Sequence, residues 1–146
     1  MRALQASEVG ILRESVEALS AYHNAVSRHF AGAYPTRPCE ETLAAFAASL
    51  AAGASRAVVI EDGGRVVGFC KLDLHGASGK LDYLFVDEAH RGQGHGGALM
   101  DWAMAAFAAA GVRHIEVKVV DGNPAIHLYE KYGFRTNAHI LVREEN

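Results

Sequence analysis

The spacing of apolar residues changes along the chain from a helical period to alternation and back to a helical period. Between Ser7 and about Phe30, apolar residues recur mostly three or four positions apart, and Ser7 can cap the first turn. This spacing predicts an amphipathic helix or two helices in succession. A second helix follows a proline-containing loop and is predicted from Glu40 to Ala52, ending at Gly53.

Beyond Gly53 the pattern is typical of strands. Ala57–Ile60 and Arg65–Leu74 are β-branched or alternating runs, and the Glu-Asp-Gly-Gly sequence between them predicts a hairpin. The later predicted elements are a strand at Lys80–Val86, a helix from about Gly94 to Ala110, a strand at Val112–Val120, a short helix at Pro124–Tyr132 and a last strand within Phe134–Arg143. This order predicts a mixed α/β (α+β) fold, with an antiparallel meander followed by a strand–helix–strand unit.

Composition and charge limit the classes of function. A chain of 146 residues with 50% hydrophobic and 21% charged residues fits one globular domain over residues 1–146. The net charge is −3 and the basic residues are scattered, so nucleic acid is not an expected partner. No apolar run approaches the roughly 18 residues that cross a bilayer, and Met1–Gly10 lacks a secretory pattern. We therefore expect a soluble, cytoplasmic protein with no membrane partner.

The positions of cysteine and histidine do not indicate a metal site. Cys39 and Cys70 have no neighbour at metal-ligand spacing, and none of the eight histidines forms a His-Glu-x-x-His motif. We expect no bound metal, and we expect both cysteines to be free thiols that pack as small hydrophobic residues.

The chemical signal of the chain lies between Val86 and Gly96, in the sequence Val-Asp-Glu-Ala-His-Arg-Gly-Gln-Gly-His-Gly. This glycine-rich turn joins a predicted strand to a predicted helix. Several backbone N–H groups therefore converge at a helix N-terminus, which carries roughly half a positive charge. Such a turn favours an anion, most often a phosphate.

Two other nucleotide-binding motifs fit this turn less well. Gly92–Gly97 satisfies the Gly-x-Gly-x-x-Gly pattern of dinucleotide-binding folds, with Asp121 as an acidic residue further along. However, Asp87–Arg91 separates the predicted strand from the first glycine, and little chain remains after the turn for a substrate domain. A kinase-type P-loop is excluded because the chain has no Gly-Lys-Ser or Gly-Lys-Thr.

Two blocks together resemble a known family. Arg91-x-x-Gly94-x-Gly96, after a strand and before a long helix, resembles the acetyl-CoA signature of the GNAT superfamily of N-acetyltransferases. A second block, Asn123-Pro-Ala-Ile-His-Leu-Tyr129-Glu-Lys-Tyr-Gly-Phe134, is similar to a family segment that ends in Leu-Tyr-Glu-Lys-x-Gly-Phe. The resemblance implies a mixed, mostly antiparallel sheet with splayed middle strands, flanked by helices.

The resemblance also implies where acetyl-CoA binds, namely between the two splayed strands. Leu84 and Val86 would offer backbone groups to the pantetheine arm, and Asn123 would contact the same arm. Backbone amides of the turn would hold the pyrophosphate, and these belong to Arg91, Gly92, Gln93, Gly94, His95 and Gly96. The glycines allow the backbone to approach the phosphates closely, so no charged side chain is needed.

Acetyl transfer to an amine needs a neutral nucleophile, a donor for the oxyanion and a proton for the departing thiolate. By resemblance Tyr129 is the general acid, and a backbone N–H at or near Val86 is the oxyanion donor. Asp82 and Glu116, on strands that flank the cleft, are the alternative candidates for the base. Asp82 is expected to share a strand face with Leu84 and Val86.

The expected acceptor is a primary amine on a small molecule, attacked directly in a ternary complex. Acetylation of protein lysines or N-termini and a non-catalytic acetyl-CoA-binding module are the alternatives. Ribosomal-protein N-terminal acetyltransferases, which the chain resembles, have a glutamate where this chain has Lys118, which weakens a protein N-terminus as acceptor. Tyr34, Arg37 and Glu40 are the candidate specificity residues. Family members are often homodimers, but no feature of the sequence demands a dimer.

Overall fold

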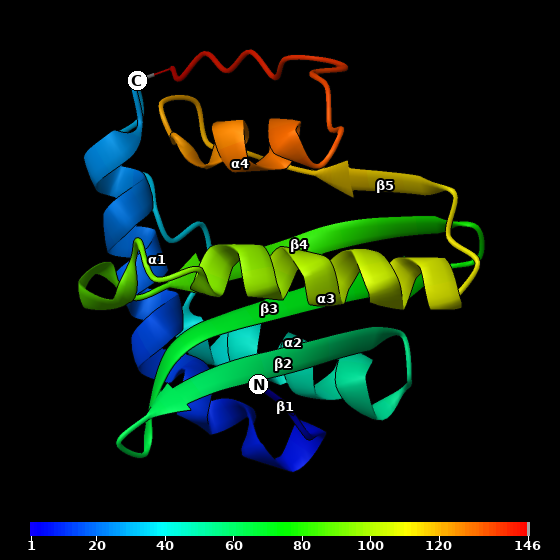
Figure 1. Cartoon of the computed structure of the whole chain (residues 1–146). Helices are drawn as coiled ribbons and strands as arrows, with labels where there is room; N and C mark the ends of the chain where they lie inside the picture. The colour runs from blue at the N-terminus through cyan, green and yellow to red at the C-terminus, as the bar shows by residue number, and fades with distance from the viewer. Residues whose placement is uncertain (146) are drawn as a thin grey trace.

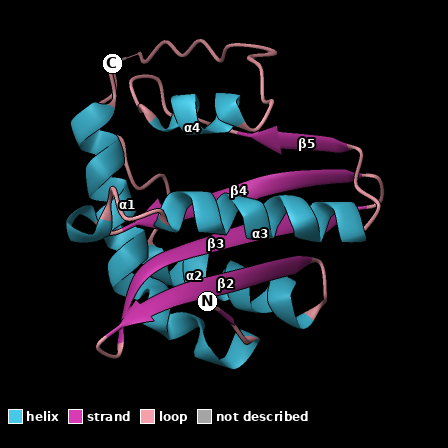
Figure 2. Cartoon of the chain, viewed as in Figure 1, coloured by secondary structure: helices cyan, strands magenta, loops and turns pink. Residues whose placement is uncertain are grey.

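The computed structural model describes residues 1–145 and contains a five-stranded sheet in the order β1-β2-β3-β4-β5. Neighbouring strands are antiparallel except β4 and β5, which run parallel. The strands are β1 (Arg2–Ala3), β2 (Ser55–Asp62), β3 (Arg65–His75), β4 (Ser78–Val86) and β5 (His114–Val117). The prediction of a mixed, mostly antiparallel sheet flanked by helices is confirmed (Figure 2).

Helices cover both faces of the sheet. One face carries the 3-10 helix η1 (Ala6–Leu12) with α1 (Arg13–Val26) and α2 (Cys39–Ala51), and the other carries α3 (His95–Ala109) and α4 (Ala125–Lys131). A short 3-10 turn, η2 (Glu88–His90), leads from β4 toward α3. In Figure 1, α3 crosses in front of the sheet and α2 lies behind it.

Each face of the sheet has its own hydrophobic core because side chains alternate along the strands. On the α1 and α2 face, Phe69 packs with Phe46, and both are buried. On the α3 face, Leu72 packs in one cluster with Phe107 of α3. Phe107 lies so close to Gly79 of β4 that an added Cβ would come within 2.5 Å of its ring. The glycine therefore allows α3 to pack directly on the backbone of β4.

β4 contains one residue more than β3 opposite it, and this extra residue is Asp82. The register shifts between Lys71 and Leu72 of β3, so a bulge forms on β4. The bulge turns Asp82 to the α2 side, where it contacts Lys71 and where Tyr83 packs against α2. Leu84 instead packs on the α3 side. The prediction that Asp82 shares a face with Leu84 and the coenzyme-binding edge is therefore wrong.

The first helical stretch is divided into η1 and α1, which is one of the two arrangements that its spacing predicts. Two other elements differ from the sequence-based expectation. β5 spans His114–Val117 instead of Val112–Val120. The prediction of a last strand within Phe134–Arg143 is wrong, because residues 134–145 form no strand. Ile140 and Leu141 of this segment are 72% and 92% exposed. An apolar run forms a strand only where a neighbouring element buries it, and from Arg135 to Glu145 every residue is exposed.

Candidate active site

β4 and β5 separate part-way along their length. Their pairing begins at Ser78 with His114 and ends at Leu81 with Val117, whereas β4 continues to Val86. Beyond Leu81, the edge of β4 that faces β5 therefore has no strand partner within residues 1–145, which confirms the predicted splay. Backbone N–H and C=O groups on such an edge are free to bind an extended ligand.

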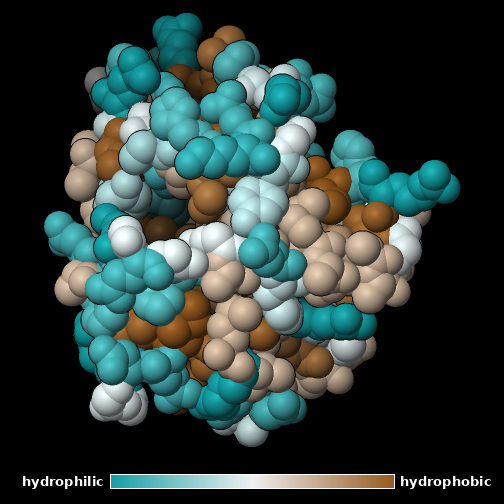
Figure 3. Space-filling view, in the orientation of Figure 1, coloured by the Kyte–Doolittle hydropathy of each residue, from teal (hydrophilic) through white to brown (hydrophobic). Residues whose placement is uncertain are grey.

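The glycine turn follows this part of β4 and leads into α3. Gly92 and Gly94 have φ angles of 77° and 86°, in the left-handed region that favours glycine. In the described part of the chain, the backbone N–H groups from Gly92 to Gly97 donate to no acceptor. Figure 3 shows the surface hollowed beside the start of α3. Free amides at the N-terminus of a 15-residue helix form a site that fits a phosphate.

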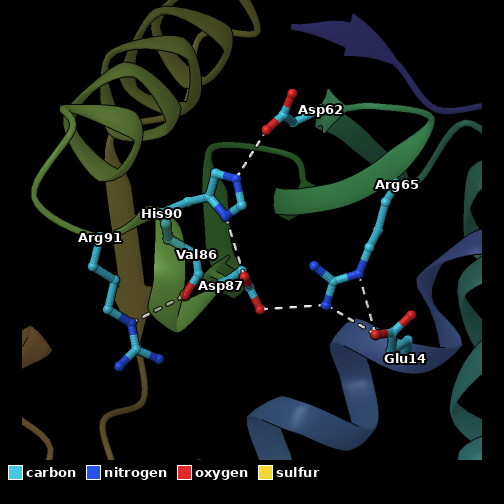
Figure 4. A network of polar contacts seen from close by, with 7 residues as sticks. All are labelled: Glu14, Asp62, Arg65, Val86, Asp87, His90 and Arg91. Atoms are coloured by element: carbon cyan, nitrogen blue, oxygen red, sulfur yellow. Dashed lines mark hydrogen bonds and ion pairs between the residues drawn. The ribbon is translucent and has the colours of Figure 1, made fainter.

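The side chain of Arg91 holds the turn against two other elements. Its Nε donates to the carbonyl oxygen of Val86 at 3.1 Å (Figure 4). Its guanidinium lies 4.5 Å from the ring centre of Tyr22 in α1, a cation–π contact. The Arg91 side chain therefore positions the turn, while the backbone amides that follow it are left for a ligand.

His90 connects the same turn to the β2–β3 hairpin. Its Nδ1 lies 3.2 Å from Asp87 Oδ2, and its Nε2 lies 3.1 Å from Asp62 Oδ2 (Figure 4). These two hydrogen bonds raise the pKa of His90, and the bond to His90 lowers the pKa of Asp87. Asp87 also lies 3.6 Å from Arg65 Nη2, which contacts Glu14 of α1 at 2.9 Å. The turn is therefore held by charges from both the hairpin and α1.

Tyr129 of α4 lies on the α3 side of the sheet. Its side chain is 7% exposed, and its ring packs edge-on against Phe134. Burial, with a smaller effect of the Cys70 thiol, raises the pKa of the Tyr129 phenol to about 12, so the group is protonated at neutral pH. Because Cys70 pairs with Leu84, this arrangement places Tyr129 beside the unpaired part of β4.

Asn123 lies two residues before α4, which begins at Ala125. Its Oδ1 accepts the backbone N–H of Ala125 at 2.9 Å, which caps the first turn. The residue before it, Gly122, has a φ of 104° and packs so closely on α1 that an added Cβ would lie 2.1 Å from the carbonyl oxygen of Val26. The loop between β5 and α4 therefore rests directly on the end of α1.

Asp82 belongs to a polar cluster on the α2 side of the sheet. The Nζ of Lys71 lies 2.7 Å from both Asp82 Oδ2 and Asp73 Oδ1, and the Lys71 side chain is only 4% exposed. Ser55 Oγ donates to Asp73 Oδ1 at 2.6 Å, and the ring of Phe46 lies 4.6 Å from Lys71 Nζ. The cluster lines a pocket of about 450 Å³, which we call the Lys71 pocket. Asp82 is also the first residue of β4 beyond its last pair with β5.

Glu116 occupies a different position from Asp82. It lies on the paired part of β5, opposite Lys80. It lines a neighbouring pocket of about 310 Å³ together with His75 and His114. The structure therefore places the two candidate bases in separate pockets, and only Asp82 stands at the point where β4 leaves β5.

Lys71 and Tyr22 are site residues that sequence reasoning missed. A lysine directly after the run Val66–Cys70 was the available signal for Lys71, because a charge at a buried position needs a partner. Nothing in the sequence marks Tyr22 as the partner of Arg91, because the two lie far apart along the chain.

Comparison with known families identifies the family of the chain. Residues 53–136 match the family model for the acetyltransferase (GNAT) domain. The chain belongs to the GNAT family. GNAT membership makes the protein an acyltransferase and supports acetyl transfer as its general chemistry. Within residues 1–145 of this GNAT protein, no helix is both long enough and apolar enough to cross a membrane.

Solved structures of other proteins share the GNAT fold. A GCN5-related N-acetyltransferase from Ralstonia eutropha JMP134 is 21% identical with a TM-score of 0.78, and the match covers 98% of this chain and 96% of that chain. A predicted acetyltransferase with acetyl-CoA from Clostridium acetobutylicum is 14% identical with a TM-score of 0.74, covering 98% and 94%. An aminoglycoside acetyltransferase from an uncultured soil metagenomic sample is 20% identical with a TM-score of 0.68, covering 99% and 97%. No curated protein sequence matches the chain.

Proposed function

We propose that this GNAT protein transfers an acetyl group from acetyl-CoA to a primary amine of a small molecule. One observation carries the proposal: the unpaired edge of β4 runs directly into a turn whose backbone amides are free. Acetyl-CoA carries its thioester at the end of an extended pantetheine arm that is joined to a pyrophosphate, so it matches both features. Leu84 and Val86 would bind the pantetheine arm, and the amides from Gly92 to Gly96 would bind the pyrophosphate. The sequence-based expectation also included the Arg91 amide, but that N–H donates to the carbonyl oxygen of Glu88 at 3.3 Å.

Tyr129 and Asp82 lie on opposite faces of β4, and this arrangement fits a proton donor and a proton acceptor. The ammonium form of the acceptor gives one proton to Asp82, directly or through water, and the neutral nitrogen then forms the new bond to the acetyl carbon. Its second proton passes to solvent as the amide forms, and solvent later restores the proton of Tyr129. The bond from that carbon to sulfur breaks, and Tyr129 donates its proton to the leaving thiolate. Because the phenol has a pKa of about 12, its proton moves only as the carbon–sulfur bond breaks, which makes positioning decisive.

The size and composition of the Lys71 pocket favour a small acceptor. Its volume is about 450 Å³, and it is an open pocket lined by Arg37, by α2 and the following loop, and by strands β2 to β4. This volume lies within the range of pockets that hold small ligands. Lys118, where a glutamate would favour a protein N-terminus, lies just beyond β5 and is exposed. These features support a small-molecule amine over a protein acceptor.

Release of free thiol from acetyl-CoA, measured with a panel of primary amines, tests the proposal. We expect amine-dependent release, and we expect Tyr129→Phe to lower kcat roughly 100-fold with little change in the KM for acetyl-CoA. Tyr132→Phe removes a phenol three residues further along the chain and is the matched control. Binding of acetyl-CoA without turnover of any amine would show a binding module instead of an enzyme. Full activity of Tyr129→Phe would exclude that residue as the acid.

A further inference from the structure

Arg37 lines the Lys71 pocket and carries a charge that no acidic side chain neutralises. Within residues 1–145, no carboxylate oxygen lies within 4.0 Å of the Arg37 guanidinium nitrogens. Glu40, in the first turn of α2, contacts Arg13 at 2.8 Å instead. The pocket that begins at Asp82 therefore has an unpaired guanidinium in its wall.

The guanidinium of Arg37 is held in a defined orientation. Its Nε donates to Thr42 Oγ1 at 3.0 Å, and Thr42 is only 4% exposed. The bond at Nε leaves the two terminal nitrogens available to another acceptor. Burial raises the pKa of the Tyr83 phenol, Asp82 adds to the increase and Arg37 opposes it, so the three groups lie close enough to interact.

The carboxylates of the Lys71 pocket already face cations. Asp82 lies 2.7 Å from Lys71 Nζ and 3.7 Å from Lys80 Nζ. Asp73 contacts Lys71 and accepts a hydrogen bond from Ser55. The acidic end of the pocket is therefore balanced, whereas the Arg37 end has a positive charge to spare. An acceptor with an anion at one end would supply the negative charge that Arg37 lacks, while an amine at its other end lies near Asp82.

We propose that Arg37 binds a carboxylate of the acceptor, so that the acceptor is a small amino acid with its reactive amine directed to Asp82. This inference rests on the proposed function, because it uses Asp82 as the place where the amine reacts. A guanidinium forms two parallel hydrogen bonds with a carboxylate, which fixes the orientation of the bound molecule. Arg37 is then a specificity residue that binds the unreactive end of the substrate.

Matched pairs of acceptors test the inference. The probes are the ω-amino acids from glycine to 6-aminohexanoate, each compared with its primary amide at equal concentrations of the neutral amine. At the chain length that spans the pocket, we expect kcat/KM for the acid to exceed that for the amide roughly 10- to 100-fold. Arg37→Gln should bring this ratio close to one, mainly through the KM for the acid. Arg37→Lys should keep part of it, because lysine retains the charge without the paired geometry.

Arg56→Gln is the control for loss of a positive charge, because Arg56 is an exposed arginine of β2 outside the pocket lining. This variant should leave the ratio of acid to amide kcat/KM unchanged. Equal rates for acids and amides, or an equal loss for both in Arg37→Gln, would overturn the inference while the proposed function stands. If no amine is acetylated, the proposed function fails, and the Nε–Hε NMR signal of Arg37 still decides binding. A shift of that signal with an amino acid but not with its amide supports the carboxylate site, and equal or absent shifts exclude it.

Discussion

Lys71 shows how a single charged residue is stabilised inside the sheet and what it does there. Its ammonium group is surrounded by Asp73, Asp82 and the ring of Phe46, so hydrogen bonds and a cation–π contact offset its desolvation. The same contacts restrict the carboxylate of Asp82 to one position at the start of the gap between β4 and β5. Lys71 is therefore a positioning residue for the proposed base.

Replacing each candidate base in turn distinguishes Asp82 from Glu116. We expect Asp82→Asn to lower kcat/KM for the amine roughly 100-fold at neutral pH, because the ammonium group loses its proton acceptor. Glu116→Gln should change it by no more than a few-fold, because Glu116 lies in the neighbouring pocket. The measurement is steady-state kinetics between pH 7 and about pH 10, where amines lose their proton in solution.

The pH dependence separates a base from a merely structural residue. If Asp82 removes the proton, the deficit of Asp82→Asn shrinks as the pH rises, because the solution then supplies neutral amine. A deficit that stays constant with pH, or a lower thermal stability that accounts for the lost activity, would contradict the role of Asp82. A larger loss in Glu116→Gln would transfer the role to that residue.

At the scale of elements, the loop between β5 and α4 depends on its contact with the end of α1. The carbonyl of Asp121 accepts the N–H of Arg28 at 3.1 Å, and Gly122 packs against Val26. These contacts keep the chain that leaves β5 beside α1 and away from β4. Backbone packing of this loop on α1 therefore helps to keep β4 and β5 apart beyond their last pair.

Substitution of Gly122 measures the strength of this contact. Gly122→Ala should lower the free energy of unfolding by about 3 kcal/mol, because a left-handed backbone conformation and a collision with the Val26 carbonyl add together. Gly32→Ala is the matched control, since Gly32 has a similar φ of 93° but nothing within 4 Å of an added Cβ. Its cost should be about 1 kcal/mol, from the backbone conformation alone. Urea unfolding of both variants checks the difference, and equal costs would show that the loop moves away freely.

Most elements could be predicted from the sequence because their signals are local. The helices α2, α3 and α4 and the strands β2 to β4 follow from periodicity, and their ends differ from the predictions by only a few residues. β1 is too short to produce a pattern, and the bulge at Asp82 depends on how β4 packs against β3 and α2. The expected strand after α4 failed because alternation alone does not supply a neighbour to pair with.

At the scale of the whole molecule, the candidate site also divides into local motifs and contacts that form only on folding. The glycine turn and the capped helix that carries Tyr129 are contiguous segments, so the sequence could predict them. The Lys71 pocket combines α2 with three strands, and its partners meet only after folding. Packing between elements therefore determines the proposed acceptor pocket, whereas the proposed phosphate-binding turn is a local motif.

The C-terminal segment contributes little to the packing of the whole molecule. From Arg135 to Glu145 every side chain is exposed, including Ile140 and Leu141. Because stability follows buried surface, a chain that ends at Arg135 should unfold within about 2 °C of the full chain. Thermal unfolding followed by circular dichroism measures this difference. A much larger loss would show that the segment pairs with the molecule in solution.

The bulge on β4 has a consequence for how this region tolerates change. A substitution at Asp82 alters one side chain, but loss of the residue would remove the bulge and restore simple alternation along β4. The residues on either side would keep their faces, because Leu81 pairs with Leu72 and Tyr83 with Lys71, which are neighbours along β3. Asp82 is therefore an insertion that adds a carboxylate beside Lys71 without displacing its neighbours, and a shortened β4 would keep its packing while it loses the proposed base.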